Sequence, residues 1–217
     1  MAFEGFSAET FDFYERLEAD NSKSFWNSHK GEYEAYVREP MLALADDLEE
    51  EFGAAQVFRP YRDTRFSADK SPYKTYQGMF VSRVMGTGFY FQISADGGHA
   101  GGGFHSRGPD QIERYRQAID AERSGTALAA MIAAFQSNGL TDGGDQLKTR
   151  PRGVAADHPR LDLLRYRSLT AGRDWPARQL PSGSAALDMI RQTWRQLIPL
   201  CDWLTEHVGA SRSERIR

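Results

Sequence analysis

The sequence has a single cysteine, no long apolar run and no excess of positive charge, and each deficit excludes a class of protein. With Cys201 as the only thiol, the chain cannot form an internal disulfide, which fits a reducing compartment. No stretch of about 18 apolar residues occurs, and the first residues lack the pattern of a secretory signal. The formal net charge of -3 gives no general attraction to nucleic acid or to an anionic membrane. We therefore expect a soluble cytoplasmic protein with neither a membrane nor a nucleic-acid partner.

What the chain does contain is enough apolar material for one core. Hydrophobic residues make up 40% of the 217 positions, and aromatic residues make up 12%. No internal repeat and no low-complexity linker divides the chain, and its length is within reach of one domain. We expect a single domain over residues 1–209, followed by a flexible tail over residues 210–217.

Helical periodicity dominates both ends of the chain. Apolar residues at three- and four-residue steps predict helices over about residues 7–19, 24–53 and 184–207. Proline removes one helix hydrogen bond, so we expect a kink or a junction of two helices at Pro40 and a bend at Pro199. Two shorter helices are predicted after Pro109.

Between these helices the period changes to two. Residues 79–82 and 89–94 alternate, and glycine-rich turns lead from them into residues 99–104, which predicts antiparallel hairpins. Gly101–Gly103 offers no side-chain packing, so we expect another segment to lie close against it. We predict a last strand over residues 166–169, and connections over residues 141–159 and at Trp175-Pro176. The predicted fold class is α+β, a single domain whose antiparallel sheet is covered by N-terminal and C-terminal helices.

The most unusual stretch is Phe58–Tyr76, which we name the basic loop. Its five basic and two acidic side chains leave an excess of three positive charges on a chain that is acidic as a whole. Pro60 and Pro72 predict a loop with short extended pieces, and interleaved aromatic residues can anchor it while the charged groups stay in water. The basic residues are Arg59, Arg62, Arg65, Lys70 and Lys74, and the acidic residues are Asp63 and Asp69.

The charges of the basic loop have two interpretations. In the first, all five basic side chains receive a phosphate or carboxylate, because guanidinium groups bind such groups in pairs of hydrogen bonds and lysine adds a point charge. In the second, Arg65 or Arg62 pairs with Asp63, and Lys70 pairs with Asp69, as structural scaffolding. Charged clusters mark functional sites only in some proteins, so the sequence leaves both interpretations open.

The histidines are weak candidates for a metal site. His99 and His105 are an even number of residues apart, so both would face the same side of a continuous strand. Together with Asp96 or Asp157 and with His158 they match no recognised ligand spacing. We therefore predict no metal site.

Several motifs resemble the bacterial and fungal family called domain of unknown function 2461. The most specific is Arg65–Thr75, and the others are Gly5-Phe6, Phe25-Trp26 with Tyr33, Gly88–Ile93, Ala156–Pro159 and Leu163-Leu164. In one departure, Asp20-Asn21 precedes Phe25-Trp26 where the family is associated with Asn-Asn and a Trp-Phe pair. The resemblance implies a single cytoplasmic-type domain, and it implies no activity, cofactor, partner or catalytic residue.

From the residues alone we predict a binding module. The basic loop, backed by the glycine-rich hairpin, would hold an anionic small molecule or a phosphorylated partner. The alternative is an enzyme of unknown chemistry in which Asp63 or Asp69 acts as a base beside the arginines, joined by His105 or His158. The sequence specifies no cofactor, no reaction and no oligomeric state.

Overall fold

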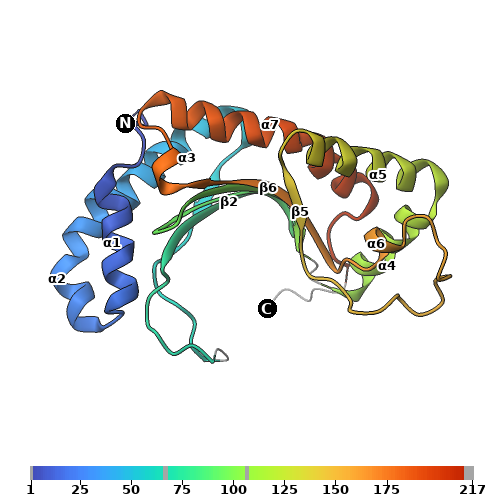
Figure 1. Ribbon diagram of the computed structural model, residues 1–217, viewed down its shortest axis with the longest axis horizontal. Helices are drawn as coiled ribbons and strands as arrows, with labels where there is room; N and C mark the ends of the chain where they lie inside the picture. The colour runs from blue at the N-terminus through green and yellow to red at the C-terminus, as the bar shows by residue number, and fades with distance from the viewer. Residues whose placement is uncertain (1, 66–67, 106–107, 213–217) are drawn as a thin grey trace. The chain divides into compact units, whose positions relative to one another are not determined.

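The computed structural model describes residues 2–65, 68–105 and 108–212, and the chain divides into two compact units (Figure 1). The first unit comprises Met1–Val81, Tyr90–Ala100 and Asp174–Gln192, and the second comprises Ser82–Phe89, Gly101–Arg173 and Thr193–Arg217.

The fold class is α+β, as predicted, with a six-stranded antiparallel sheet. The strand order is β1-β2-β3-β4-β6-β5. The strands are β1 (Ala55–Val57), β2 (Tyr76–Val84), β3 (Thr87–Ser94), β4 (Gly97–His105), β5 (Thr141–Gly143) and β6 (Ser168–Pro176). The helices are α1 (Ala8–Ala19), α2 (Lys23–Tyr33), η1 (Glu34–Arg38), α3 (Glu39–Phe52), α4 (Pro109–Asp120), α5 (Glu122–Ser137), α6 (Leu161–Leu164), η2 (Ala177–Gln179) and α7 (Ser184–His207).

The expected disturbance at Pro40 takes the form of a π-helical turn. η1 joins α2 to α3 without a break, and Pro40 lies in the first turn of α3. Because Pro40 has no N–H, the carbonyl of Tyr36 loses its α-helical donor. The hydroxyl of Thr10, which is fully buried, donates a hydrogen bond of 2.6 Å to that carbonyl instead. α1 is thereby tied to the point where the helical hydrogen-bond pattern is interrupted.

The glycine run of β4 is explained by two close neighbours in the second unit. A Cβ added at Gly102 would lie 3.3 Å from both the Cys201 sulfur and the Leu197 Cβ, so α7 packs directly on this strand. At Gly103, φ is 147° and a Cβ would lie 2.2 Å from the Leu169 carbonyl of β6. The prediction that another segment lies against this run is confirmed.

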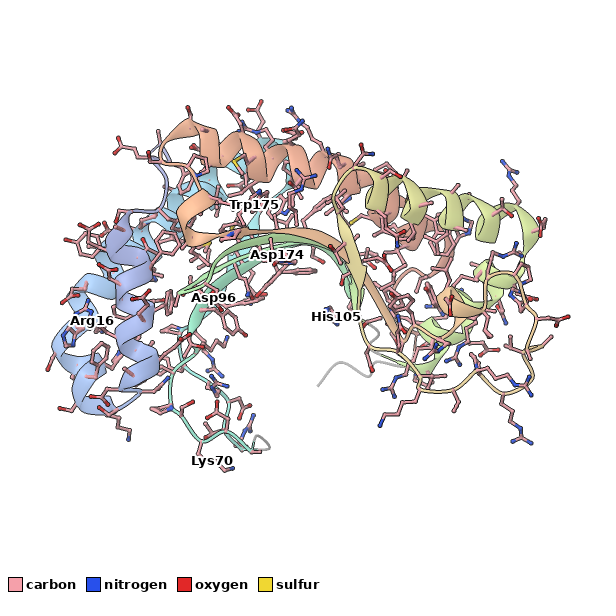
Figure 2. The ribbon with its side chains drawn as sticks, viewed as in Figure 1. Arg16, Lys70, Asp96, His105, Asp174 and Trp175 are labelled. Carbon is pink, nitrogen blue, oxygen red and sulfur yellow. The ribbon has the colours of Figure 1, made fainter. Side chains whose placement is uncertain are left out.

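Two stretches predicted as connections contain strands, and those predictions are wrong. β5 lies within residues 141–159, where three residues are too few to show a period of two. β6 runs through Trp175 to Pro176, because a proline at the last position of a strand need not donate to the sheet. Figure 2 labels Asp174 and Trp175, which occupy opposite faces of β6, with Trp175 buried and Asp174 exposed.

The end of the chain is held in part. The Ser211 hydroxyl and the Arg212 backbone N–H both donate to the Asp110 carboxylate of α4, at 2.8 Å each. Residues 213–217, the remainder of the predicted flexible tail, lie outside the described residues. Within the described part of the chain, no helix has the length and apolar character needed to cross a membrane.

We predict that Cys201 is chemically inert in the folded protein. The thiol is fully buried, it donates to the Gly88 carbonyl at 3.6 Å, and burial raises its pKa to about 12. Only the thiolate is nucleophilic, so iodoacetamide at about pH 8 should leave the native protein unmodified for hours and should label one thiol per chain after denaturation. Mass spectrometry measures both, and rapid labelling of the native protein would contradict the burial of this thiol.

Candidate functional site

The basic loop is a narrow, hairpin-like pair of segments in the first unit. Tyr61 and Tyr73 form an isolated antiparallel bridge. On either side of it, the Arg62 N–H donates to the Pro72 carbonyl at 2.9 Å and the Lys74 N–H donates to the Pro60 carbonyl at 2.8 Å. These bonds place residues 60–62 beside residues 72–74, so the positions of Arg59, Arg62 and Lys74 are set by a paired backbone.

Tyr73 anchors the loop to the junction of α1 and α2. Its ring is buried and stacks on Trp26, with ring centroids 4.3 Å apart and planes 9° apart. Asn21 binds both backbone groups of Tyr73: the Asn21 amide donates to the Tyr73 carbonyl at 3.0 Å, and the Tyr73 N–H donates to the Asn21 side-chain oxygen at 3.1 Å. The side chain of Asn21 therefore acts like a short neighbouring strand.

Gln77 anchors the other side of the loop. Its amide donates to the Phe58 carbonyl at 2.7 Å, and its side-chain oxygen accepts from the Tyr33 hydroxyl at 2.7 Å. Gln77 is 1% exposed, and a buried amide is stable only when its hydrogen bonds are satisfied. α2 and β2 thus fix the point at which the loop begins.

Three of the predicted basic residues, Arg59, Arg62 and Lys74, stand on or next to the paired segments of the loop. Burial lowers the pKa of Lys74, and the positive charges of Arg59 and Arg62 lower that pKa further. Lys74 lies over the rings of Phe58 and Tyr76, with its Nζ 5.2 Å and 5.9 Å from the ring centroids. These cation–π contacts help to hold an ammonium group that has lost part of its hydration.

Arg62 is the most constrained of the three. One guanidinium nitrogen pairs with Asp69 at 2.8 Å. Its Nε is buried and has no hydrogen-bond partner among the described residues. Arg59 forms no ion pair within the described part of the chain, so Asp69 is the one carboxylate there that pairs with any of the three cations.

The other two predicted basic residues are engaged near the far end of the loop, where Figure 2 labels Lys70. Arg65 pairs with Asp63 through two hydrogen bonds of 3.0 and 2.7 Å and is 77% exposed. Lys70 donates to the Thr64 carbonyl at 2.9 Å. The predicted pairing of Arg65 with Asp63 is present, but the predicted pairing of Lys70 with Asp69 is wrong, because Asp69 pairs with Arg62 instead. Arg59 and Lys74 form no ion pair among the described residues. Phe66 and Ser67, which belong to the family-like motif, lie outside the described residues.

Neither aspartate of the loop is suited to act as a base. Hydrogen bonds from the Arg65 side chain lower the pKa of Asp63 to about 2. The Ser71 hydroxyl and N–H both donate to Asp69 and lower its pKa as well. A general base works best with a pKa near the working pH, and both shifts move away from it.

The two histidines considered as supports belong to the second unit. His105 is exposed, and its N–H donates to the Gly86 carbonyl at 2.9 Å. His158 accepts a hydrogen bond of 3.0 Å from the Arg160 N–H through Nδ1, and its Nε2 lies 3.2 Å from the Asp120 carboxylate. Within residues 2–65, 68–105 and 108–212, no three or more His, Cys, Asp or Glu side chains are grouped so that they could hold a metal ion.

Two aromatic rings, one at the start of the loop and one from β3, extend the surface next to Lys74. Phe58 and Tyr90 have ring centroids 6.2 Å apart, and both rings lie over Gly78. A Cβ at Gly78 would be 2.9 Å from the Tyr90 hydroxyl and 3.3 Å from the Phe58 ring, so only glycine leaves room for them. A ligand at Lys74 would therefore meet partly exposed rings as well as positive charge.

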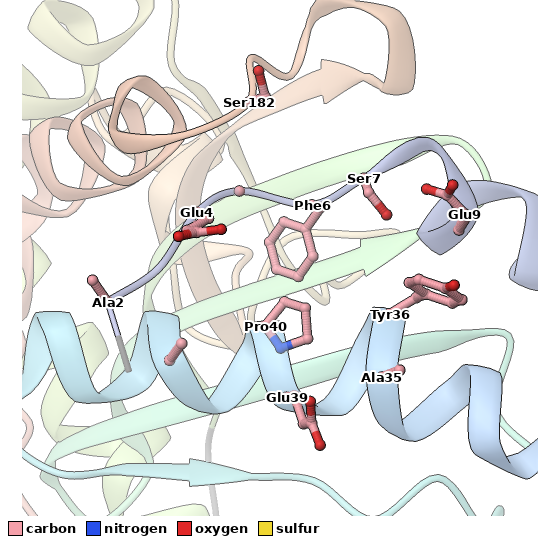
Figure 3. A pocket seen from close by; sticks show the side chains of 12 residues that line it. Ala2, Glu4, Phe6, Ser7, Glu9, Ala35, Tyr36, Glu39, Pro40 and Ser182 are labelled. Carbon is pink, nitrogen blue, oxygen red and sulfur yellow. The ribbon is translucent and has the colours of Figure 1, made fainter.

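A separate hollow of the first unit has the opposite charge (Figure 3). It has a volume of about 530 Å³, and Figure 3 shows Phe6, Tyr36 and Pro40 on its walls together with Glu4, Glu9 and Glu39. The described residues that line this hollow include no lysine, arginine or histidine. It does not fit an anion.

The anchoring residues were missed by the sequence analysis. Asn21 and Gln77 were not singled out as anchors, because neither spacing nor composition shows that a side chain hydrogen-bonds a distant backbone. An available signal was Trp26 with Tyr73: aromatic residues flanking a polar, charged loop indicate where it is anchored.

A family model described as "Conserved hypothetical protein (DUF2461)" matches residues 9–203, which is most of the chain. The chain belongs to the DUF2461 family. The basic loop and its anchors lie wholly within the matched range, so they are part of the DUF2461 domain. The family description assigns no activity, and no match was found among curated proteins.

We predict that Asn21→Ala loosens the basic loop of this DUF2461 domain while leaving the rest folded. The change leaves both backbone groups of Tyr73 without their partner, which should cost about 1–3 kcal/mol of local stability. Limited trypsin digestion should then cut at Arg65 and Lys70 on the order of tenfold faster, with little change in circular dichroism. The control is Asn27→Ala, a change at an exposed position of α2, and trypsin should cleave it at the same rate as the wild type. Equal cutting rates for all three proteins would show that Asn21 does not hold the loop.

Proposed function

We propose that this DUF2461 domain is a binding module for a phosphate- or carboxylate-bearing molecule, with Arg59, Arg62 and Lys74 as its ligand-binding residues. The observation that carries the proposal is that Arg59, Arg62 and Lys74 stand on one pair of bonded segments, where the charges of Arg59 and Arg62 act on Lys74 and where Asp69 pairs with Arg62 alone. Like charges held close together cost free energy, and an anion bound between them would remove that cost.

The chemistry of the three side chains supports an oxyanion ligand. Arg59 and Lys74 form no ion pair within the described chain, and Arg62 pairs with one carboxylate, Asp69. Guanidinium groups bind phosphate and carboxylate oxygens through two parallel hydrogen bonds, and Lys74 adds a point charge. The rings of Phe58 and Tyr76 beneath Lys74 favour a ligand that also has an apolar or planar part.

The anchored backbone supports binding rather than a purely structural role. A scaffold would need only the two local pairs, Arg65 with Asp63 and Arg62 with Asp69. Arg59 and Lys74 add positive charge without adding an ion pair among the described residues. Because the loop is already paired and anchored, little ordering would be needed when a ligand binds.

The test compares single charge removals by thermal shift in inorganic phosphate and in citrate at constant ionic strength. Both anions should stabilise the wild type. Arg59→Gln and Lys74→Gln should each weaken binding about tenfold or more, because a hydrogen bond to a charged group contributes about 1.5–3 kcal/mol. Arg65→Gln is the matched control from the same loop: its guanidinium already pairs with Asp63, so it should bind like the wild type.

Three results would contradict this proposal. The first is that the wild type binds neither anion. The second is that Arg59→Gln and Lys74→Gln bind the anions as tightly as the wild type does. The third is that Arg65→Gln loses as much affinity as those two variants. The last result would indicate general charge attraction, not a site. Unfolding of a variant, seen as a lost melting transition, would favour the scaffold interpretation.

A pH prediction follows from Lys74. Burial and the neighbouring arginines lower its pKa, so the group loses its proton at a lower pH than an exposed lysine does. Affinity for sulfate, whose charge is constant above neutral pH, should therefore fall as the pH rises through this lowered pKa. Bound anion favours the charged form and should raise the Lys74 pKa. Measuring sulfate affinity as a function of pH in the wild type and in Lys74→Gln checks this, since the variant should lose the pH dependence. If the variant keeps the same pH dependence, another group is responsible for it.

A further inference from the structure

The second unit contains a cavity lined by four arginines. It has a volume of about 640 Å³, and it lies between the first half of α4 and the segment that leads from β5 towards α6. Its walls include Arg116 from α4, Arg150 and Arg152 from the connecting segment, and Arg167 just before β6. Glu113 is the one carboxylate among its described lining residues.

Among the described residues, the carboxylates paired with or lining this cavity neutralise only part of its positive charge. Arg167 pairs with Asp145 at 2.6 Å, and Glu113 accepts a hydrogen bond of 3.3 Å from Gln117. Even if Asp145 and Glu113 each offset one guanidinium, two of the four positive charges remain. Burial lowers the pKa of Arg116, and the charge of Arg167 lowers it further, so these two guanidinium groups repel each other.

The backbone that carries Arg150 and Arg152 is tied down just before them. The Leu147 N–H donates to the Arg165 carbonyl at 2.8 Å, and the Arg165 guanidinium donates back to the carbonyls of Leu147 and Lys148 at 3.0 and 3.3 Å. Pro151, between the two arginines, is buried. Arg150 and Arg152 are exposed and form no ion pair within the described residues. Their backbone is held while their guanidinium groups remain available.

We propose that this cavity binds a small molecule carrying a diphosphate or triphosphate group. Four guanidinium groups from three separate segments can surround two or more phosphates, whereas a single carboxylate would engage only one or two of them. The volume falls in the usual range of small-molecule sites. Ile112 and Pro151 line it as apolar surface, and Gln117 and Thr149 supply hydrogen-bonding groups for the remainder of such a ligand. The net charge of -3 opposes a long polyanion, which favours a small ligand over a nucleic acid.

The test is isothermal titration of the full chain with inorganic pyrophosphate and with ADP, both without added metal. The variant Arg59→Gln/Lys74→Gln serves as the background, so that binding at the basic loop does not contribute and this proposal is tested independently of the proposed function. Arg150→Gln and Arg152→Gln should each weaken binding about tenfold. Glu113→Gln should strengthen binding severalfold, because it removes the one carboxylate from the lining and can keep the contact with Gln117.

The matched control is Arg123→Gln, which removes the same charge from an exposed position of α5 in the same unit. It should bind like the background protein. The proposal is overturned if neither pyrophosphate nor ADP binds, or if Arg150→Gln and Arg152→Gln bind like Arg123→Gln. It is also overturned in favour of nucleic-acid binding if a single-stranded oligonucleotide binds more tightly than ADP and displaces it.

Discussion

The candidate site depends on one constraint, the burial of Tyr73 between the first two helices and the loop. A loop rich in like charges tends to stay extended and mobile, because its charged groups repel each other and prefer water. Here the Tyr73 ring stacks on Trp26, and both of its backbone groups are bonded to Asn21. The buried ring and the two hydrogen bonds oppose the repulsion, so the cations near Tyr73 are held at defined positions despite their charge.

The distance along the loop from this anchor explains why its basic residues behave differently. Arg62 and Lys74 are each within one residue of the Tyr61–Tyr73 bridge, and backbone hydrogen bonds prevent them from moving apart. Arg65 and Lys70 lie beyond the bridge, and each bonds an acceptor within the loop, Asp63 for one and the Thr64 carbonyl for the other. An exposed pair of this kind contributes little to stability, so the repulsion between like charges that the fold must offset is concentrated at the anchored end.

Much of the fold could be predicted from local patterns, and the exceptions have physical causes. Helical periodicity over residues 7–19 and 184–207 located α1 and α7, and alternation located the hairpins of β2, β3 and β4. The strands β1 and β5 have three residues each and form only because longer strands, β2 and β6, offer them an edge. The hydroxyl of Thr10 bonds the π-helical turn before Pro40 from 26 residues away, so no local pattern could show it.

The candidate site could be predicted only in part. The composition of the basic loop indicated a charged site, but the positions of its cations depend on Asn21 and Gln77, which bond backbone groups 52 and 19 residues away.

The same reasoning separates two kinds of charged cluster in this protein. The basic loop is conspicuous in the sequence because its charges lie close together along the chain. Charges of both signs can pair locally, and three of the basic residues, Arg62, Arg65 and Lys70, pair or bond within the loop. The arginines of the second unit come from positions 116, 150, 152 and 167, so no window of the sequence shows them as a group. Charges that meet only through folding have few sequence neighbours to neutralise them, and their repulsion must be overcome by the stability of the surrounding fold. Both clusters therefore contain a partly buried cation whose pKa is lowered by its neighbours, Lys74 in the loop and Arg116 in the second unit, but only the first could be found from the spacing of charges in the sequence.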